Sequence, residues 1–175
     1  MTPSTYLSLF LTISMIFISH AIPPKSSPKL YKSVCKEPGH KDFEQRCLKT
    51  LEAYPQITST EDYLTFSRLF LKIVAIKNAV KAQHQVKEMK NKYPSSAVIK
   101  YCAESYGGVV SELKSALREE DPDLINLLVQ YAYNAVGACE HVLAKEKSVN
   151  TSSISALNNE ITFLIDIAGI ASRHV

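Results

Sequence analysis

The sequence is poor in glycine and lacks the alternation of apolar and polar residues that marks β-strands. Only five glycines occur in 175 residues, and no segment of useful length follows a period of two. Apolar residues recur instead every three or four positions along most of the chain, which is the period of an α-helix. These absences argue against β-rich folds, and the helical period predicts an all-α protein.

Catalytic signatures are missing as well. The chain has no Gly-rich phosphate loop, no His-Glu-x-x-His pair and no Gly-x-Ser-x-Gly elbow. Its histidines are scattered, and the carboxylates from Glu119 to Asp121 precede a helix start, where the helix dipole accounts for them. We therefore expect a protein that is not an enzyme, has no catalytic residues and needs no cofactor. A binding or inhibitory module fits these absences best.

One apolar run stands out, and it lies at the N-terminus. The thirteen residues Tyr6–Ile18 precede Ser19-His20-Ala21, which places small residues at the −3 and −1 positions of a signal-peptidase site, although no Lys or Arg precedes Lys25. The run is shorter than the roughly 20 residues that cross a bilayer. We expect a signal peptide over residues 1–21 and one secreted domain over 22–175, with no membrane contact after cleavage and no nucleic-acid partner.

The four cysteines fit two disulfides in an oxidising compartment. Two of them bound the segment SVCKEPGHKDFEQRC, which could be a metal-binding loop or a small hairpin closed by a disulfide. A structural zinc site requires four nitrogen or sulfur ligands, whereas this segment offers Cys35, His40 and Cys47. The composition therefore favours the disulfide, and we expect no metal site.

Spacing around the turns predicts how the cysteines pair. Cys35 and Cys47 each lie six residues from Lys41, just after Pro38-Gly39. Cys102 and Cys139 lie about equally far from a turn near residues 120–121, so two antiparallel helices would bring them level. The expected disulfides are Cys35–Cys47 and Cys102–Cys139.

Four long amphipathic helices joined by short connections are predicted. Short connections make neighbouring helices antiparallel, which gives an up-down-up-down four-helix bundle over residues 60–175. A short α-hairpin, hinged at Pro38-Gly39, is expected before it over residues 28–54. The helices are expected at 61–92, at 97–119, from Asp121-Pro122 onward, and from about residue 153 to the end.

The periodicity also assigns a core-facing stripe to each long helix. In the first, the stripe runs from Phe66 to Val80 and on to Met89. In the third, it comprises Leu124, Leu128, Tyr131, Ala135, Cys139 and Val142. The tyrosines of the second and third helices are expected to occupy half-buried positions.

Charge is distributed unevenly along the chain. Residues 63–100 carry eight Lys or Arg against Glu88 alone, a balance of +7, whereas residues 101–175 carry five basic and ten acidic residues, a balance of −5. A solvated basic face explains the first segment, and contact with an anionic polysaccharide or an acidic protein is the sharper alternative. Asn150-Thr151-Ser152 is an N-glycosylation sequon in a polar stretch, so Asn150 is an expected glycan site.

Three segments together resemble the plant invertase/pectin methylesterase inhibitor family. They are VCKEPGHKDFEQRCLKTLEAYP, with the first two cysteines; YCAESYGGVVSELKSAL, with Cys102, Glu104 and Tyr106; and VQYAYNAVGACEHVL, with Cys139 and Glu140. The resemblance implies an α-hairpin on a four-helix bundle, with first-to-second and third-to-fourth disulfides. It also implies a protein that blocks the active-site cleft of a plant carbohydrate enzyme in a stoichiometric complex.

The target within that family is a further expectation. The family's invertase inhibitors carry Pro-Lys-Phe at the start of the third bundle helix, where this chain has Pro122-Asp123-Leu124. A carboxylate there would face the carboxylates of a glycosidase site. Pectin methylesterase inhibitors often have Thr before the fourth cysteine, where this chain has Ala138.

We accordingly expect an inhibitor of plant pectin methylesterase. The alternatives are an inhibitor of cell-wall or vacuolar acid invertase (β-fructofuranosidase) and a non-inhibitory binder of anionic wall polysaccharide. The expected protein is a monomer that binds its target 1:1 in the apoplast, with the vacuole as a second location. Its expected target-binding residues are Asp121, Pro122, Asp123 and Leu124.

Overall fold

The computed structural model describes residues 29–147 and 149–175, and within these ranges the chain forms helices and no strand. The signal peptide expected over residues 1–21 lies outside the described residues. The helices are α1 (Leu30–Lys36), α2 (Lys41–Glu52), α3 (Pro55–Thr58), α4 (Tyr63–Phe70), the π-helical turn η1 (Leu71–Ala75), α5 (Ile76–Lys92), α6 (Ala97–Arg118), α7 (Pro122–Leu143) and α8 (Ser152–Ser172).

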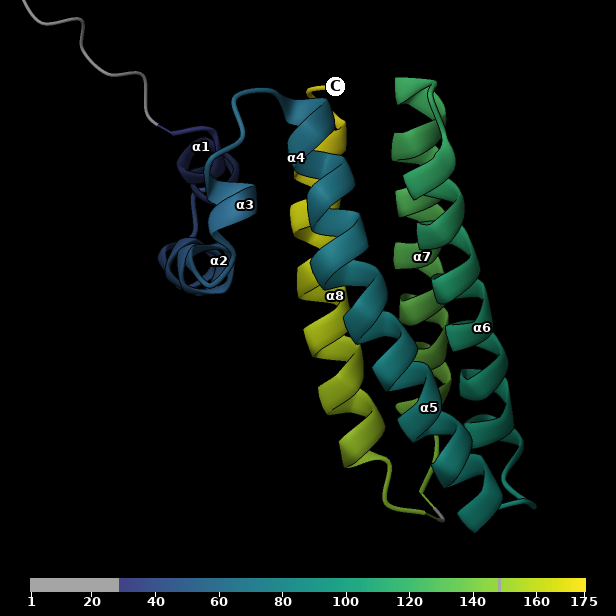
Figure 1. Ribbon diagram of the computed structural model, residues 1–175. Coiled ribbons are helices and arrows are strands. Elements are labelled where there is room, and N and C mark those ends of the chain that lie inside the picture. The colour runs from purple at the N-terminus through teal and green to yellow at the C-terminus, as the bar shows by residue number, and fades with distance from the viewer. Residues whose placement is uncertain (1–28, 148) are drawn as a thin grey trace, which may run out of the picture.

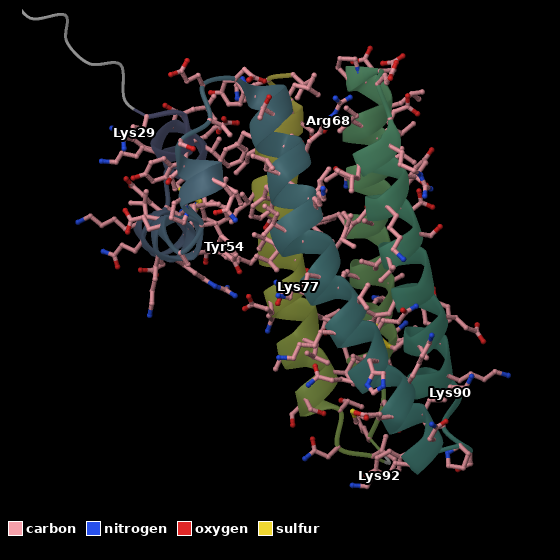
Figure 2. The ribbon with its side chains drawn as sticks, in the orientation of Figure 1. Lys29, Tyr54, Arg68, Lys77, Lys90 and Lys92 are labelled. Atoms are coloured by element: carbon pink, nitrogen blue, oxygen red, sulfur yellow. A yellow bond between two sulfur atoms is a disulfide. The ribbon has the colours of Figure 1, made fainter. Side chains whose placement is uncertain are left out.

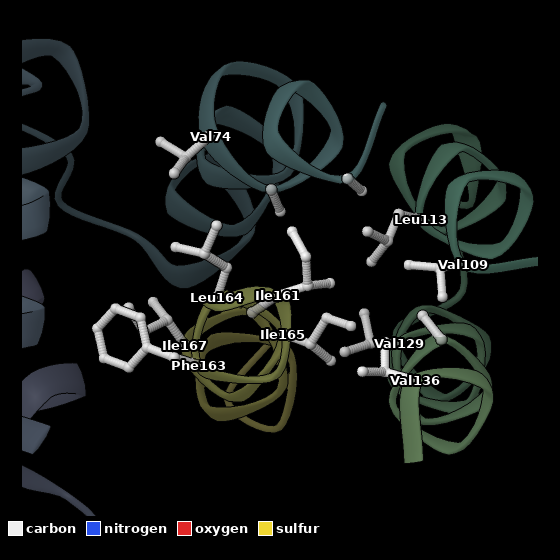
Figure 3. Packing of buried hydrophobic residues seen from close by; sticks show 14 of the residues in the cluster. Val74, Val109, Leu113, Val129, Val136, Ile161, Phe163, Leu164, Ile165 and Ile167 are labelled. Atoms are coloured by element: carbon white, nitrogen blue, oxygen red, sulfur yellow. The ribbon is translucent and has the colours of Figure 1, made fainter. Parts of the chain in front are cut away.

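The long helices form the up-down-up-down bundle that the sequence predicts (Figure 1). α4, η1 and α5 make one continuous rod, and the neighbouring pairs are α5 with α6, α6 with α7, α7 with α8, and α8 with α4. The α4–α5 rod therefore lies diagonally opposite α7, as the view along the bundle in Figure 3 shows. Aliphatic side chains such as Leu113, Val136 and Ile161 fill the space between the four helices.

The π-helical turn changes which face of the first rod is buried. The predicted stripe places Val80 in the core, but its side chain is 41% exposed, while Ala79, Ala82 and Val86 are buried. A π-turn adds a residue to one turn of the helix, so every position after η1 is rotated relative to a regular α-helix. The prediction for Val80 was wrong because the sequence pattern gives no sign of this turn.

The buried face of α7 also differs from the prediction. Leu124 and Tyr131 belong to the predicted core-facing stripe, yet they are 43% and 49% exposed, and Tyr131 fits only the half-buried position expected of the tyrosines. α7 is apolar around most of its circumference, so two adjacent stripes fit the helical period and the sequence alone does not choose between them. The residues of α7 that are buried are Ile125, Val129, Ala132, Val136, Cys139 and Leu143.

Both predicted disulfides are present. Cys35–Cys47 joins α1 to α2, and Cys102–Cys139 joins α6 to α7, with Cα atoms 5.4 Å and 4.8 Å apart. Gly39, between α1 and α2, has a φ of +72°, which glycine adopts without the cost that a Cβ would impose. In the part of the chain that the structure describes, no group of three or more His, Cys, Asp or Glu side chains could hold a metal ion.

Removing the Cys102–Cys139 disulfide should destabilise the protein more than removing Cys35–Cys47. The two bonds close segments of 37 and 12 residues, and a longer loop constrains the unfolded chain more. Replacing Cys102 and Cys139 by Ser should lower the free energy of unfolding by about 2–5 kcal/mol, about 1 kcal/mol more than the matched change at Cys35 and Cys47. Denaturant titration of both variants measures this difference, and an equal or smaller loss at Cys102–Cys139 would contradict the prediction.

The α-hairpin is attached to the bundle chiefly through α8. The Glu37 carboxylate accepts hydrogen bonds from Arg173 Nη2 at 2.9 Å and from the His174 ring at 2.7 Å. Further along α8, Phe43 packs edge-to-face on Phe163, with ring centroids 5.3 Å apart. α8 is long and apolar enough to cross a membrane by length and composition alone, but 56% of its apolar window is buried inside the protein, as expected of a core helix.

These contacts alter the ionisation of Glu37. Partial burial acts to raise the pKa of the Glu37 carboxyl, but the hydrogen bonds and charges of His174 and Arg173 outweigh it and hold the pKa below its usual range. A depressed pKa means that the folded state favours the ionised form. The contribution of ionised Glu37 to the stability of the fold is therefore complete above the ordinary pKa of 4.5. It is lost as the pH falls through the lower pKa of the folded state.

Replacing Glu37 by Gln should therefore have its full cost in stability above about pH 4.5, and this cost should shrink as the pH falls through the lower, folded-state pKa. Because the side chain is 35% exposed, solvent screening limits the loss to about 1 kcal/mol or less. Unfolding free energies of parent and variant, measured between pH 3 and pH 6, should converge at the acid end. Glu52→Gln, which neutralises an exposed carboxylate on α2, is the control. A Glu37→Gln cost that persists undiminished at pH 3 would contradict the assigned ionisation.

Candidate functional site

A buried polar network beside the Cys102–Cys139 disulfide links three helices of the bundle. The Tyr106 hydroxyl on α6 donates to Asn158 Oδ1 on α8 at 2.9 Å, and Asn158 Nδ2 donates to Glu140 Oε2 on α7 at 2.7 Å. The Ser155 hydroxyl donates to the other oxygen of Glu140 at 3.0 Å. Burial, followed by the charge of Glu140, raises the pKa of the Tyr106 phenol well above its usual value. This network holds the helices together, with Tyr106 and Asn158 buried and Glu140 and Ser155 partly exposed.

Asn158 is the buried member of this network that the sequence analysis did not identify, and Ser155 was also missed. Tyr106 and Glu140 belong to segments that carry the family resemblance, whereas Asn158 lies in a helix considered only for its apolar residues. It is 2% exposed, and buried amides require partners. An amide among the apolar positions of α8 was therefore the available signal.

Local hydrogen bonds occupy much of the acidic cluster at the turn between α6 and α7. Asp121 caps α7, because its Oδ1 accepts from the backbone N–H groups of Asp123 at 2.9 Å and Leu124 at 3.5 Å. Glu119 Oε1 accepts from the backbone N–H of Glu120 at 2.8 Å and from that of Asp121 at 3.2 Å. These two carboxylates thus stabilise the turn, and Pro122 takes the first helical position, which suits its fixed φ.

An arginine from the opposite side of the bundle supports the same turn. Arg68 extends from α4 toward α6 and α7 (Figure 2), and its Nη2 donates to the backbone carbonyl of Glu119 at 3.3 Å. Arg68 is partly buried. The end of the bundle that carries residues 119–124 is therefore held in place before any partner binds.

Asp123 and Leu124 differ from the capping residues because their side chains are free to contact a partner. Both are exposed, and the described structure contains no hydrogen bond or ion pair from the Asp123 carboxylate. Of the four residues expected to bind a target, Asp121 and Pro122 therefore have structural roles at the helix start. Asp123 and Leu124 are the two that present chemistry to the solvent.

Leu124 begins an apolar row on the solvent side of α7. Leu127, at 41% exposure, and Tyr131, at 49%, follow it at intervals of three and four residues, which places all three side chains on one helix face. We call Leu124, Leu127 and Tyr131 the α7 stripe. The sequence analysis did not single out Leu127, because it placed Leu124 and Tyr131 in the core stripe.

A pocket of about 460 Å³ lies between the α1–α2 loop, α7 and α8. Phe43, Val129 and Ile165 are among its apolar lining residues, and Tyr133 and Asp166 are among the polar ones. Burial raises the pKa of the Asp166 carboxyl, although the charge of Arg173 opposes the shift. The pocket adjoins α7 on a different face from the α7 stripe and contains none of the expected target-binding residues.

The fold and this surface define a class of protein: a disulfide-linked helical bundle with an exposed apolar row on one helix. The chain belongs to the plant invertase/pectin methylesterase inhibitor family, whose model matches residues 29–169.

The solved structures that resemble the fold include two pectin methylesterase inhibitors. One is a mutant form A of a pectin methylesterase inhibitor from Arabidopsis, with a TM-score of 0.66 and 16% identity, covering 82% of this chain and 97% of that one. The other is a pectin methylesterase inhibitor from Arabidopsis thaliana, with a TM-score of 0.58 and 17% identity, covering 82% of this chain and 93% of that one. At these identities the likeness concerns the fold. A search of curated proteins gave no match.

Proposed function

We propose that the protein is a secreted inhibitor of a plant pectin methylesterase and that it covers the enzyme's active-site cleft in a 1:1 complex as a monomer. The α7 stripe is the observation that carries the proposal. A soluble protein gains nothing from exposing two leucines and a tyrosine along one helix face, whereas partner binding buries them. Family membership supports inhibition as the result of that binding.

The composition of this face suits a protein partner. Tyrosine is among the residues enriched at the energetic centres of protein–protein interfaces, and polar groups typically surround such centres. Tyr131 supplies the aromatic anchor, and Asp123 lies at one end of the row. The turn at residues 119–121 is fixed by its own hydrogen bonds, which lowers the cost of ordering the backbone on binding.

Asp123 supports pectin methylesterase over acid invertase as the target. The family's invertase inhibitors have a lysine at the corresponding position. Asp123 is exposed and without a side-chain partner in the described structure, so it would bring an uncompensated carboxylate to the carboxylates of a glycosidase site. A like charge at that place opposes binding to invertase.

The proposed domain plan places the α7 stripe and the expected glycan apart. We propose a signal peptide over residues 1–21, the hairpin over 28–54 and the bundle over 60–175. Asn150 is exposed in the connection between α7 and α8, and its Oδ1 accepts from the backbone N–H of Ser152 at 3.0 Å. That connection lies at the other end of the bundle from the α6–α7 turn (Figure 1). A glycan on Asn150 would thus extend away from the target in the apoplast.

Titration of pectin methylesterase with the purified protein tests the inhibitor proposal. Activity should fall linearly and end near one equivalent. Tyr131→Ala should weaken inhibition about tenfold or more, because truncating an anchor at the centre of an interface costs about 2 kcal/mol or more. Tyr101→Ala is the matched control, since Tyr101 is 44% exposed on α6, and it should inhibit like the parent. Absence of inhibition by the parent would refute the function, and equal effects of both substitutions would refute the site.

Replacing Asp123 by Lys and Leu124 by Phe should create inhibition of acid invertase. The double variant restores the Pro-Lys-Phe pattern and leaves the Asp121 cap and both disulfides untouched. The parent should inhibit invertase weakly or not at all, and the variant should inhibit it measurably in the same assay. A parent that already inhibits invertase strongly, with no gain in the variant, would show that residues elsewhere determine the target.

A further inference from the structure

A row of lysines occupies the solvent side of α5. Lys77, Lys81, Lys87 and Lys92 are all exposed, while the buried side of this helix is formed by Ala79, Ala82 and Val86. We call these four lysines the lysine ridge. From Lys77 to Lys92 the ridge extends about 22 Å, at 1.5 Å per residue. Figure 2 shows its two ends, with Lys77 near the middle of the rod and Lys92 at the end of α5.

The positive charge of the ridge is not compensated. In residues 29–147 and 149–175, none of the four lysines forms an ion pair with a carboxylate. The acidic residue on the same helix, Glu88, is paired with His84 at 3.4 Å. The acidic residues near the α6–α7 turn lie at the other end of the bundle from Lys92 (Figure 1). Lys92 Nζ lies 5.4 Å from the centroid of the Tyr93 ring, which leaves its charge in place. The ridge therefore presents to the solvent a line of cations that no carboxylate neutralises.

The ridge lacks the features of a protein-binding surface. Val80 is the exposed large apolar side chain of α5, and the described part of this helix face has no exposed aromatic residue. The centres of protein interfaces are depleted of charged residues and enriched in aromatic anchors. The α7 stripe has this composition, whereas the lysine ridge does not. A row of ammonium groups along a convex helix matches instead a linear polymer with a negative charge on successive units.

We propose that the lysine ridge binds a linear polycarboxylate polysaccharide, namely demethylated polygalacturonate. The identity of the polymer rests on the proposed function, because a pectin methylesterase converts neutral methyl esters on this backbone into carboxylates. α5 lies diagonally opposite α7 in the bundle, so the polymer and the enzyme can occupy the protein at the same time. The ridge thus concentrates the inhibitor where the enzyme has already generated charge.

Affinity chromatography on immobilised polygalacturonate tests this proposal. The parent should be retained at low salt and elute as salt rises, because screening weakens such contacts over about 10 Å at 0.1 M. It should not be retained on the same backbone in its fully methyl-esterified form. In the ridge variant, Lys77, Lys81, Lys87 and Lys92 are all replaced by Gln. Its affinity for polygalacturonate should be lower than that of the parent by about tenfold or more.

A matched variant separates the ridge from net charge. Four exposed lysines of the hairpin, when replaced by Gln, remove the same charge and should leave retention unchanged; they are Lys32, Lys36, Lys41 and Lys49. Equal losses in the two variants, or equal retention of the parent on the methyl-esterified polymer, would overturn the proposal. Failure of the parent to bind polygalacturonate at low salt would overturn it as well.

Measuring inhibition of pectin methylesterase with the same variants separates the inhibitor proposal from the polymer-binding proposal. Initial rates of pectin methylesterase on highly methylated pectin should be inhibited equally by the parent and the ridge variant, because the α7 stripe is intact in both. Binding to polygalacturonate by a parent that does not inhibit would refute the proposed function and leave the charge recognition standing. Inhibition by a parent that does not bind the polymer would refute the ridge proposal alone.

Discussion

The fixed relation between α6, α7 and α8 is the constraint on which the surface chemistry depends. The Cys102–Cys139 disulfide joins α6 to α7, and the bonds from Tyr106 to Asn158 and from Asn158 to Glu140 extend the link to α8. A buried amide with all its partners permits one arrangement of the helices and penalises others. Since α7 cannot rotate without breaking these contacts, its exposed side chains are set by its buried ones.

The sequence predicted the architecture but not the rotation of every helix. Both disulfides, the hairpin hinge at Gly39 and the four long helices followed from spacing and period. Val80 and Tyr131 were assigned to the wrong side of their helices, for different reasons: a π-turn shifts the first rod, and α7 is apolar on more than one face. Periodicity measures how apolar residues repeat, and neither a π-turn nor the choice between two adjacent stripes alters that repeat.

Only part of the candidate site was predicted, because the sequence does not determine which face of each helix is exposed. Sequence comparison directed attention to Asp121, Pro122, Asp123 and Leu124, and the structure separates the cap from the exposed pair. Leu127 and Tyr131 became candidates only when their exposure was known. The lysine ridge was visible as a charge imbalance, but its alignment on one side of α5, opposite α7, required the bundle. The protein thus has an apolar row on α7 and a cationic row on α5, which we propose bind an enzyme and a polyanion, respectively.

Chemical modification of exposed tyrosines tests the central claim, that the α7 stripe contacts the target, most directly. Tyr101, Tyr131 and Tyr133 are all exposed in the free protein, at 44%, 49% and 40%, so mild nitration should modify all three. In a purified complex with pectin methylesterase, mass spectrometry of the peptides should show Tyr131 protected and Tyr101 still modified. A complex in which Tyr131 reacts as fast as in the free protein would contradict the account.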